Sequence, residues 1–366
     1  MASVHHIDKT LLVLILTLSG VGFLMFISAS IGLVGSSNLT PGKIIFKQLL
    51  TGLGVGGILF IAAIRINYKF WYRTSFIFFI LASILMLLVL LPGLGFSHGG
   101  AQRWLDLGPI SFQPAELLKF AFIIYLAAWL SARKKDVDTG KFGLLPFLAI
   151  MGFVSFLFLL QSDLGTLAVI LASATLLFFI GGGRILHLVF AGLVVVLMLV
   201  LMISFEDYRK DRIMTFFYPD SDISGAGWQL YQSQIAIGSG GWLGAGFGEG
   251  VQKYKYLPEA IGDSIFAVIA EEFGFVGSFV LLSLYIFLLW RFVHIALNSS
   301  DYFARLLGSG IVIIILVQTF VNIGSMVGLI PLTGLPLAFI SQGGSSLAVT
   351  LFSTGILLNI SKYKKV

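Results

Sequence analysis

The residues of this chain that could do acid–base chemistry are few, and most stand at the ends of long apolar runs. Glu116 and Lys119 are three residues apart, which places them on one face of a helix where they can pair. Asp263 directly precedes an apolar run, and Glu271 and Glu272 follow two helical turns later. A carboxylate at the membrane surface can serve as a general base. The Glu116–Lys119 pair could line a polar cavity within the membrane.

Each of these residues also has a purely structural interpretation. The Glu116–Lys119 pair could be a local ion pair that lowers the cost of burial, and its spacing alone favours neither interpretation. Asp263 could cap the helix that follows it, and residue type alone favours the cap over the general base, because caps are far commoner. Glu271 and Glu272 are adjacent, so at most one of them can face a given cavity.

Other arrangements exclude several kinds of site. The chain has no cysteine, which excludes disulfides, thiolate metal sites and cysteine nucleophiles. Its five histidines are scattered along the sequence and do not predict one metal site. The glycine-rich segment Gly244–Gly250 matches neither phosphate-binding glycine pattern, so we expect its glycines to form tight turns instead.

The elements that must position these residues are membrane helices. Of the 366 residues, 58% are hydrophobic and 11% are charged. Soluble domains have about 25% charged residues, so a water-soluble enzyme is excluded. Ten apolar runs are each near the roughly 20 residues that a helix needs to cross a bilayer. They are Thr10–Ser30, Gln48–Ile64, Thr74–Pro92, Ala115–Leu130, Phe142–Ser162, Leu164–Gly183, Ile185–Phe205, Ser264–Trp290 and two runs within Leu306–Ser361, which Pro331 and Pro336 separate.

The predicted fold is therefore an all-α polytopic membrane protein with about ten transmembrane helices. Residues 1–366 are expected to form one membrane domain, with a long extracytoplasmic loop at about residues 205–263 between helices 7 and 8. With both termini in the cytoplasm, 14 Lys and Arg residues fall in cytoplasmic segments and 8 fall outside. This bias follows the positive-inside rule. Most acidic residues fall outside, which indicates that the polar chemistry is at the outer face.

Four stretches of the sequence together resemble the SEDS family of bacterial membrane proteins, whose members include FtsW, RodA and SpoVE. The stretches are Gly100–Lys119, Gln161–Gly165, Tyr256–Gly274 and Pro331–Ser346. Within the third, Lys255-Tyr-Leu-Pro-Glu-Ala260 is more similar to the FtsW branch. The resemblance covers nearly the whole chain, and it agrees with the ten predicted spans.

This resemblance implies a peptidoglycan glycosyltransferase that polymerises lipid II into glycan strands at the outer face of the cytoplasmic membrane, for cell division or cell shape. The essential aspartate of the family falls on Asp263, which would be the catalytic general base of an inverting transfer. The substrate-binding residues that the resemblance implies are Glu116, Lys119, Arg103, Arg212, Gln161, Ser341 and Ser345.

The resemblance also implies cofactors, partners and location. The transfer needs no nucleotide or covalent cofactor and no metal ligand is predicted, while the participation of a divalent cation is left open. The expected partners are lipid II, a class B penicillin-binding protein transpeptidase and other divisome or elongasome membrane proteins, and no nucleic acid. The expected location is the bacterial cytoplasmic membrane, including the division septum.

Two other classes of function stay open, and the first would use the same outer cavity. A lipid II flippase would need alternating access, which often shows as internal repeats, and no clear inverted repeat is present in the sequence. A non-catalytic scaffold for a partner transpeptidase would not need Asp263. Polymerisation of purified lipid II by the wild type and by Asp263→Ala distinguishes these functions.

Overall fold

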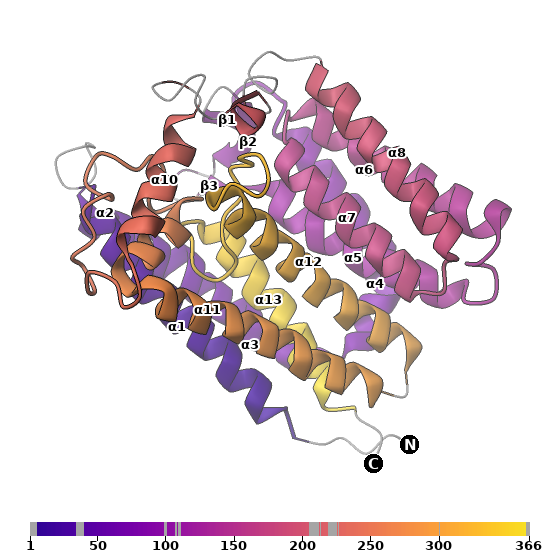
Figure 1. Cartoon of the computed structure of the whole chain (residues 1–366). Coiled ribbons are helices and arrows are strands. Elements are labelled where there is room, and N and C mark those ends of the chain that lie inside the picture. Colours follow the sequence, from indigo (N-terminus) through magenta and orange to yellow (C-terminus); the bar gives the residue numbers. More distant parts are fainter. Residues whose placement is uncertain are drawn as a thin grey trace.

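The computed structural model shows a bundle of long helices (Figure 1) and describes residues 6–33, 40–98, 101–106, 108, 111–204, 212, 214–218, 225, 227–299 and 301–363. The helices within these residues are α1 (Lys9–Ile31), α2 (Pro41–Lys47), α3 (Gly56–Arg65), α4 (Tyr68–Leu88), α5 (Pro114–Ala132), α6 (Leu145–Leu160), α7 (Leu164–Ile180), α8 (Ile185–Ser204), α10 (Trp228–Ser239), α11 (Ile265–Leu297), α12 (Tyr302–Met326) and α13 (Gly344–Ser361). Two π-helical segments, η1 (Gln48–Val55) and η2 (Gly140–Leu144), make α2–η1–α3 and η2–α6 continuous.

The predicted spans are confirmed as helices. Among the described residues, eight helices are long and apolar enough to cross a membrane, and α7 and α8 add two shorter apolar helices. The 56-residue charge-free run is divided as predicted, because α12 ends at Met326 and α13 begins at Gly344. The backbone between them, from residue 327 to residue 343, is not helical.

Polar side chains fix where several helices begin. Asp8 caps α1 by accepting a hydrogen bond from the amide of Leu11 (3.0 Å). Asp163 caps α7 by accepting from the amide and the hydroxyl of Thr166. Pro114 occupies the first turn of α5, where its missing N–H costs nothing. These caps satisfy amides that have no partner within their own helix.

The centre of the bundle is α13, together with α5 and α12. In the apolar windows of these three helices, 94%, 72% and 67% of the residues are buried, against 22% in α11. Close contact between α13 and α3 requires small residues, because a Cβ on Gly355 would lie 2.6 Å from the carbonyl oxygen of Phe60. Such small-residue contacts are typical of helix packing in membranes. The central helices therefore carry side chains that cannot reach lipid.

A small antiparallel sheet, which the sequence did not predict, lies at one end of the bundle (Figure 1), beside α5 and α13. It consists of β1 (Gly95–His98), β2 (Ala101–Asp106) and β3 (Ser111–Phe112), in that order. The first and last helices meet at the other end, where the amide of Asp8 donates to the hydroxyl of Ser361 (3.0 Å). The sheet holds the segment that leads directly into α5 and Glu116.

Candidate active site

Asp263 lies at the entrance to α11 and is 8% exposed. Its Oδ1 accepts a hydrogen bond from Nε2 of Gln229 on α10 (3.0 Å), and its backbone carbonyl accepts one from Nδ2 of Asn322 on α12 (2.7 Å). The N-cap residue of α11 is Ser264, whose side chain makes no capping hydrogen bond. The interpretation of Asp263 as a simple helix cap is therefore wrong, and its carboxylate is held by tertiary contacts instead.

Burial raises the pKa of Asp263 to about 6, because the ionised carboxylate loses contact with water. The nearby carboxylate of Glu259 raises this pKa further, while the hydrogen bond from Gln229 and the charge of Arg212 lower it. A carboxyl group with a pKa near 6 is still ionised at neutral pH, and it is a stronger base than an ordinary aspartate.

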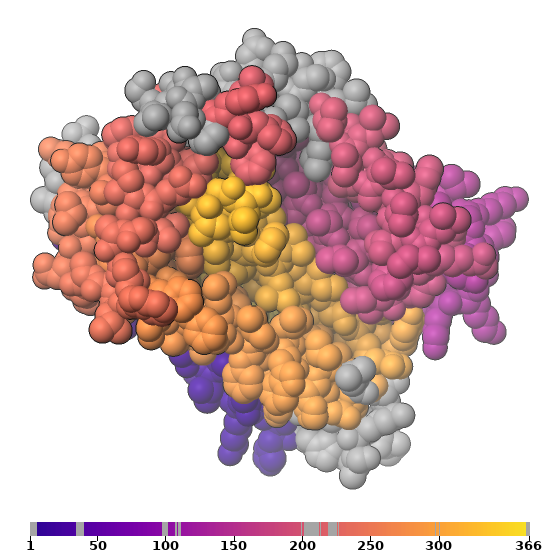
Figure 2. Space-filling view, in the orientation of Figure 1, coloured from indigo at the N-terminus to yellow at the C-terminus, as the bar shows by residue number. Residues whose placement is uncertain are grey.

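Arg212 approaches the other carboxylate oxygen across Gly334. A Cβ on Gly334 would lie 3.8 Å from Oδ2 of Asp263 and 3.9 Å from Nη1 of Arg212. Nη1 of Arg212 also donates to the carbonyl of Leu332 (3.0 Å). Because Gly334 is exposed, the surface at this glycine adjoins the carboxylate. Figure 2 shows the segment between α12 and α13 reaching the surface between α10 and α7.

Glu116 and Lys119 form a buried ion pair on α5. Their Oε2 and Nζ atoms are 2.9 Å apart, and each residue is 1% exposed. Nζ of Lys119 also donates to Oε1 of Gln318 on α12 (2.6 Å), and Nε2 of Gln318 donates to the carbonyl of Pro336 (2.7 Å). The prediction that these two residues pair is confirmed, and Gln318 links the pair to the segment that passes Asp263.

Two amides of α12 connect the ion pair to Asp263. Gln318 and Asn322 are four residues apart, and therefore on one face of the helix. Besides the carbonyl of Asp263, Nδ2 of Asn322 donates to the carbonyl of Leu335 (2.7 Å), next to the carbonyl of Pro336 that Gln318 holds. Hydrogen bonds and the peptide bond between Leu335 and Pro336 thus connect Lys119 to the backbone of Asp263. The sequence analysis missed both amides, although polar side chains in an apolar helix were an available signal.

Arg103 and Gln161 come together away from Asp263's hydrogen-bond network. The guanidinium of Arg103, on β2, donates to the carbonyls of Gln161 (3.3 Å) and Ser162 (2.5 Å). The side-chain amide of Gln161 donates to the carbonyl of Met86 on α4 (2.8 Å). These contacts join the sheet to the turn between α6 and α7, so they hold the backbone in this structure.

Ser341 and Ser345 also bind backbone groups. The hydroxyl of Ser341 accepts from the amide of Leu337 (2.7 Å) and thereby closes a turn. The hydroxyl of Ser345 accepts from the amide of Gln113 (3.2 Å), the residue before α5. Ser345 therefore links the start of α13 to the start of the helix that carries Glu116 and Lys119.

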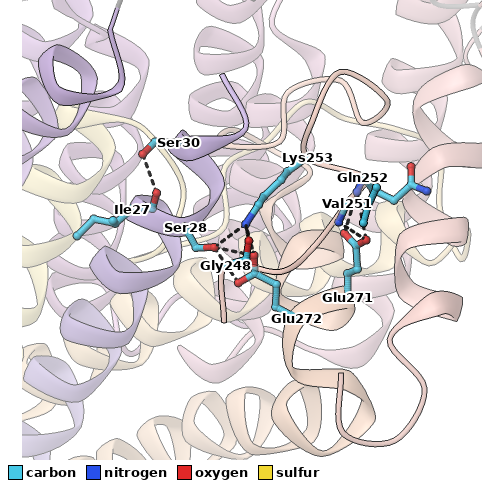
Figure 3. Close-up of polar contacts among 9 residues, drawn as sticks. All are labelled: Ile27, Ser28, Ser30, Gly248, Val251, Gln252, Lys253, Glu271 and Glu272. Atoms are coloured by element: carbon cyan, nitrogen blue, oxygen red, sulfur yellow. Dashed lines mark hydrogen bonds and ion pairs between the residues drawn. The ribbon is translucent and has the colours of Figure 1, made fainter. Parts of the chain in front are cut away.

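A second buried ion pair joins three segments of the chain (Figure 3). Nζ of Lys253 lies 2.5 Å from Oε1 of Glu272 on α11, and both side chains are 0% exposed. The hydroxyl of Ser28 on α1 donates to Glu272 (2.6 Å) and accepts from Lys253 (3.0 Å). Lys253 also donates to the carbonyl of Gly248 (2.8 Å). We call Ser28, Lys253 and Glu272 the three-segment cluster.

Glu271 faces away from the three-segment cluster, as the adjacency of the two glutamates predicts. Its Oε1 accepts from the backbone amides of Val251 (2.7 Å) and Gln252 (3.1 Å) (Figure 3). Both glutamates thus bind the segment that precedes Asp263. Glu272 binds the side chain of Lys253, and Glu271 binds the backbone amides of Val251 and Gln252.

α11 is interrupted at Gly274, whose φ of 64° and ψ of −160° are not helical. The carbonyls of Glu271 and Glu272 would ordinarily accept from the amides of Phe275 and Val276. Instead, all four groups bond to the loop that follows α10, at distances of 2.9 to 3.1 Å. Their partners there are Gly241, Trp242, Ala245 and Gly246. Non-helical backbone is tolerated at membrane depth when other protein groups satisfy it.

The glycines of the Gly244–Gly250 segment form tight turns, as predicted. Gly244, Gly246 and Gly248 have positive φ values of 80°, 110° and 86°. A Cβ on Gly244 would lie 2.2 Å from the carbonyl oxygen of Glu272. These glycines allow the loop to approach the interrupted helix.

The chain matches a family model described as "Cell cycle protein", for FtsW, RodA and SpoVE, over residues 9–366. The chain belongs to this family. This SEDS chain is 36% identical to stage V sporulation protein E of Bacillus subtilis, over 98% of both chains. It is also 36% identical to the probable peptidoglycan glycosyltransferase FtsW of Trichlorobacter lovleyi, over 97% of this chain and 93% of that one.

Solved structures share this fold. The chain is similar to one in a structure titled "Structural coordination of polymerization and crosslinking by a peptidoglycan synthase complex", with a TM-score of 0.79, 28% identity and 98% of each chain covered. It is also similar to the rod shape determining protein RodA of Thermus thermophilus, with a TM-score of 0.72, 27% identity and coverage of 98% and 97%. The predicted family and the polytopic helical fold are both confirmed.

Proposed function

We propose that this chain is a peptidoglycan glycosyltransferase that polymerises lipid II at the outer face of the cytoplasmic membrane. The observation that carries the proposal is the environment of Asp263. Its carboxylate is buried and has a raised pKa, and it adjoins the surface at Gly334 together with Arg212. The family and the names of the relatives support the same activity.

In the proposed reaction, Asp263 removes the proton of the acceptor sugar's 4-hydroxyl group as that oxygen attacks the anomeric carbon of the donor. The new glycosidic bond forms as the bond from the anomeric carbon to the pyrophosphate oxygen breaks. Undecaprenyl pyrophosphate leaves with both bonding electrons, and the configuration at the anomeric carbon is inverted. The proton stays on the carboxyl group until solvent takes it. This step needs a base that is ionised at neutral pH, which a pKa of about 6 provides.

Arg212 and the Glu116–Lys119 pair are assigned to the anionic substrate groups. Arg212 is the cation beside Oδ2 of Asp263, so it is the first choice for the developing charge on the pyrophosphate. Lys119 acts from the far end of the hydrogen-bonded connection through Gln318. Substrate contacts by Arg103, Gln161, Ser341 and Ser345 stay predictions, since these side chains bind protein groups in this structure.

A divalent cation is assigned no step. In the part of the chain that the structure describes, no three His, Asp or Glu side chains gather as ligands for a metal ion. The steps proposed above use the carboxylate and the cationic side chains of this chain.

The proposed topology places both termini in the cytoplasm and the loop at about residues 205–263 outside, within one membrane domain. The excess of basic residues in the proposed cytoplasmic segments supports it. An impermeant thiol reagent should label Lys135→Cys only from the inside and Ser221→Cys only from the outside, and Ser221 lies beyond the described residues. The reverse labelling would contradict this orientation.

The proposed protein partner is a class B penicillin-binding protein transpeptidase. The structural relative in a complex that coordinates polymerization and crosslinking supports this choice. Other divisome or elongasome proteins and a septal location belong to the same proposal.

Polymerisation of purified lipid II tests the function. Asp263→Asn keeps an amide oxygen that can accept from Gln229 but cannot take a proton, so we expect the rate to fall about 10²- to 10⁴-fold. The variant should elute as a monodisperse protein like the wild type. Near wild-type polymerisation by a folded Asp263→Asn protein would exclude the general base, and lipid II transfer across vesicles without polymerisation by the wild type would indicate a flippase.

A further inference from the structure

Gln229 is the second residue of α10, and its amide group reaches both residues at the entrance to α11. Nε2 donates to Oδ1 of Asp263 and to Oγ of Ser264, at 3.0 Å each. A carboxylate oxygen can only accept, so the NH₂ side of the amide must face it. Both hydrogens of this nitrogen are used, which fixes the direction of the amide and the position of Oδ1.

The two oxygens of Asp263 are therefore not equivalent. In the described part of the chain, Gln229 is the only side chain hydrogen-bonded to the carboxylate, and it binds Oδ1. Oδ2 points toward exposed Gly334 and Arg212. A substrate hydroxyl arriving from that surface meets Oδ2, while Oδ1 faces α10.

The helix that carries Gln229 is itself firmly held. The carbonyl of Gln229 accepts from the hydroxyl of Ser233, a residue with 0% exposure on the next turn. The indole nitrogen of Trp228 donates to the carbonyl of Tyr256 (3.1 Å), in the loop that leads to Asp263. A side chain held on a packed helix can fix the geometry of a catalytic group.

We propose that Gln229 is a positioning residue of the polymerisation reaction, holding Oδ1 of Asp263 so that Oδ2 is presented to the acceptor hydroxyl. This inference rests on the proposed function. It assigns a role in the reaction to α10, an element in which the sequence analysis named no functional residue.

The pH profile distinguishes positioning from a merely structural role. The charged groups that face Asp263 are Glu259, in the preceding loop, and Arg212, on the other side of Gly334. Glu259 and burial raise the pKa of Asp263, and Gln229 and Arg212 lower it. Loss of the Gln229 hydrogen bond should raise it further. Because the ionised form is the active one, the rise of kcat with pH should move to higher pH.

The experiment compares kcat and KM for lipid II between pH 5 and pH 8 in three variants of the full chain. Gln229→Met removes the donor at similar size, and we expect kcat at neutral pH to fall roughly tenfold or more, with KM changed less than about twofold. Gln229→Glu places a second carboxylate against Oδ1, so its acidic limb should move further to high pH than that of Gln229→Met. Ser239→Ala, at the other end of α10, is the control and should match the wild type.

Unchanged kcat and an unchanged acidic limb in a folded Gln229→Met protein would overturn the positioning role, provided that Asp263→Asn is inactive. If Asp263→Asn is itself active, the proposed function has failed instead. If Gln229→Met does not give a monodisperse protein, the profile of Gln229→Glu decides: a limb at the wild-type pH would contradict the proposal.

Discussion

The two buried ion pairs of this protein have nearly the same chemistry but different connections. Glu116 and Lys119 belong to one helix, so their mutual attraction holds no two elements together. Lys253 and Glu272 belong to different segments and share Ser28 of a third. Burying a charge pair is costly in either case. The attraction within the second pair joins separate segments, whereas the first pair reaches another helix only through the hydrogen bond from Lys119 to Gln318. From this comparison we expect the three-segment cluster to matter for stability, and the proposed action on substrate to belong to the Glu116–Lys119 pair.

The largest expected effect comes from breaking the three-segment cluster. Lys253→Met leaves Glu272 buried without its cation, and we expect a loss of about 3–5 kcal/mol in unfolding free energy. Adding Glu272→Gln to Lys253→Met should recover much of that loss, because the double variant has no unpaired buried charge. Thermal unfolding in detergent, followed by the fluorescence of the six tryptophans, measures both.

The control for this prediction is an exposed ion pair between Arg184 and Asp138, whose side chains are 64% and 49% exposed. Asp138→Asn should change stability by no more than about 0.5 kcal/mol. If Lys253→Met lowered the unfolding free energy by no more than this control does, the three-segment cluster would not stabilise the fold.

The second prediction is that removing the Glu116–Lys119 pair lowers activity rather than stability. Glu116→Gln with Lys119→Met removes both charges, so the double variant should be more stable than either single variant. Its polymerisation of lipid II should nevertheless fall by about 10²-fold or more, since a positioned charge is lost. Stability and activity are measured on the same preparation.

Recovery of activity along with stability in that double variant would make the two pairs equivalent. The comparison would then be broken, and Glu116 and Lys119 would be structural residues.

The smallest expected effect is at Asp263, which carries a buried charge with no ion-pair partner at salt-bridge distance among the described residues. Its pKa is raised from an ordinary 3.8 to about 6, so the folded state binds the proton more tightly than the unfolded state. The contribution of this group to the stability is therefore most favourable below about pH 4, and it is lost as the pH rises from about 4 to about 6. Asp263→Asn removes this dependence. The difference in unfolding free energy between variant and wild type should therefore shift in favour of the variant by roughly 1–3 kcal/mol between pH 4 and pH 7.5.

Melting temperatures of both proteins at the two pH values test this prediction. If the stability of the variant relative to the wild type were the same at pH 4 and pH 7.5, burial would not destabilise the ionised carboxylate.

Charged residues in apolar runs were the part of the site that could be predicted from the sequence. The ten spans, the Glu116–Lys119 pair and the divergence of Glu271 from Glu272 all follow from helical periodicity and the cost of burial. Asp263 was placed correctly at the entrance to α11, although residue type alone favoured a helix cap. The family resemblance, not the spacing, gave the catalytic assignment.

The partners of the neutral amides could not be predicted. Gln318 and Asn322 stand out only as polar residues in an apolar helix, and Gln229 is one of several polar residues in α10. Nothing in these segments says which acceptors the amides bind, because those acceptors lie on other elements. The Lys253–Glu272 pair could not be predicted either, because the fold of the intervening loop decides which residues come into contact. The break at Gly274 also escaped, since a lone glycine in an apolar helix is ordinarily tolerated.

The interruption of α11 has a consequence for the order of assembly during synthesis. The four backbone groups freed around Gly274 find partners between Gly241 and Gly246, which a ribosome adds before α11 itself. The loop that supplies these partners is therefore already present when the interrupted helix emerges. α11 need not enter the bilayer with unsatisfied amides and carbonyls. Moving α11 ahead of that loop by circular permutation would expose those groups to lipid, so we expect the nascent chain to be retained by the insertion machinery.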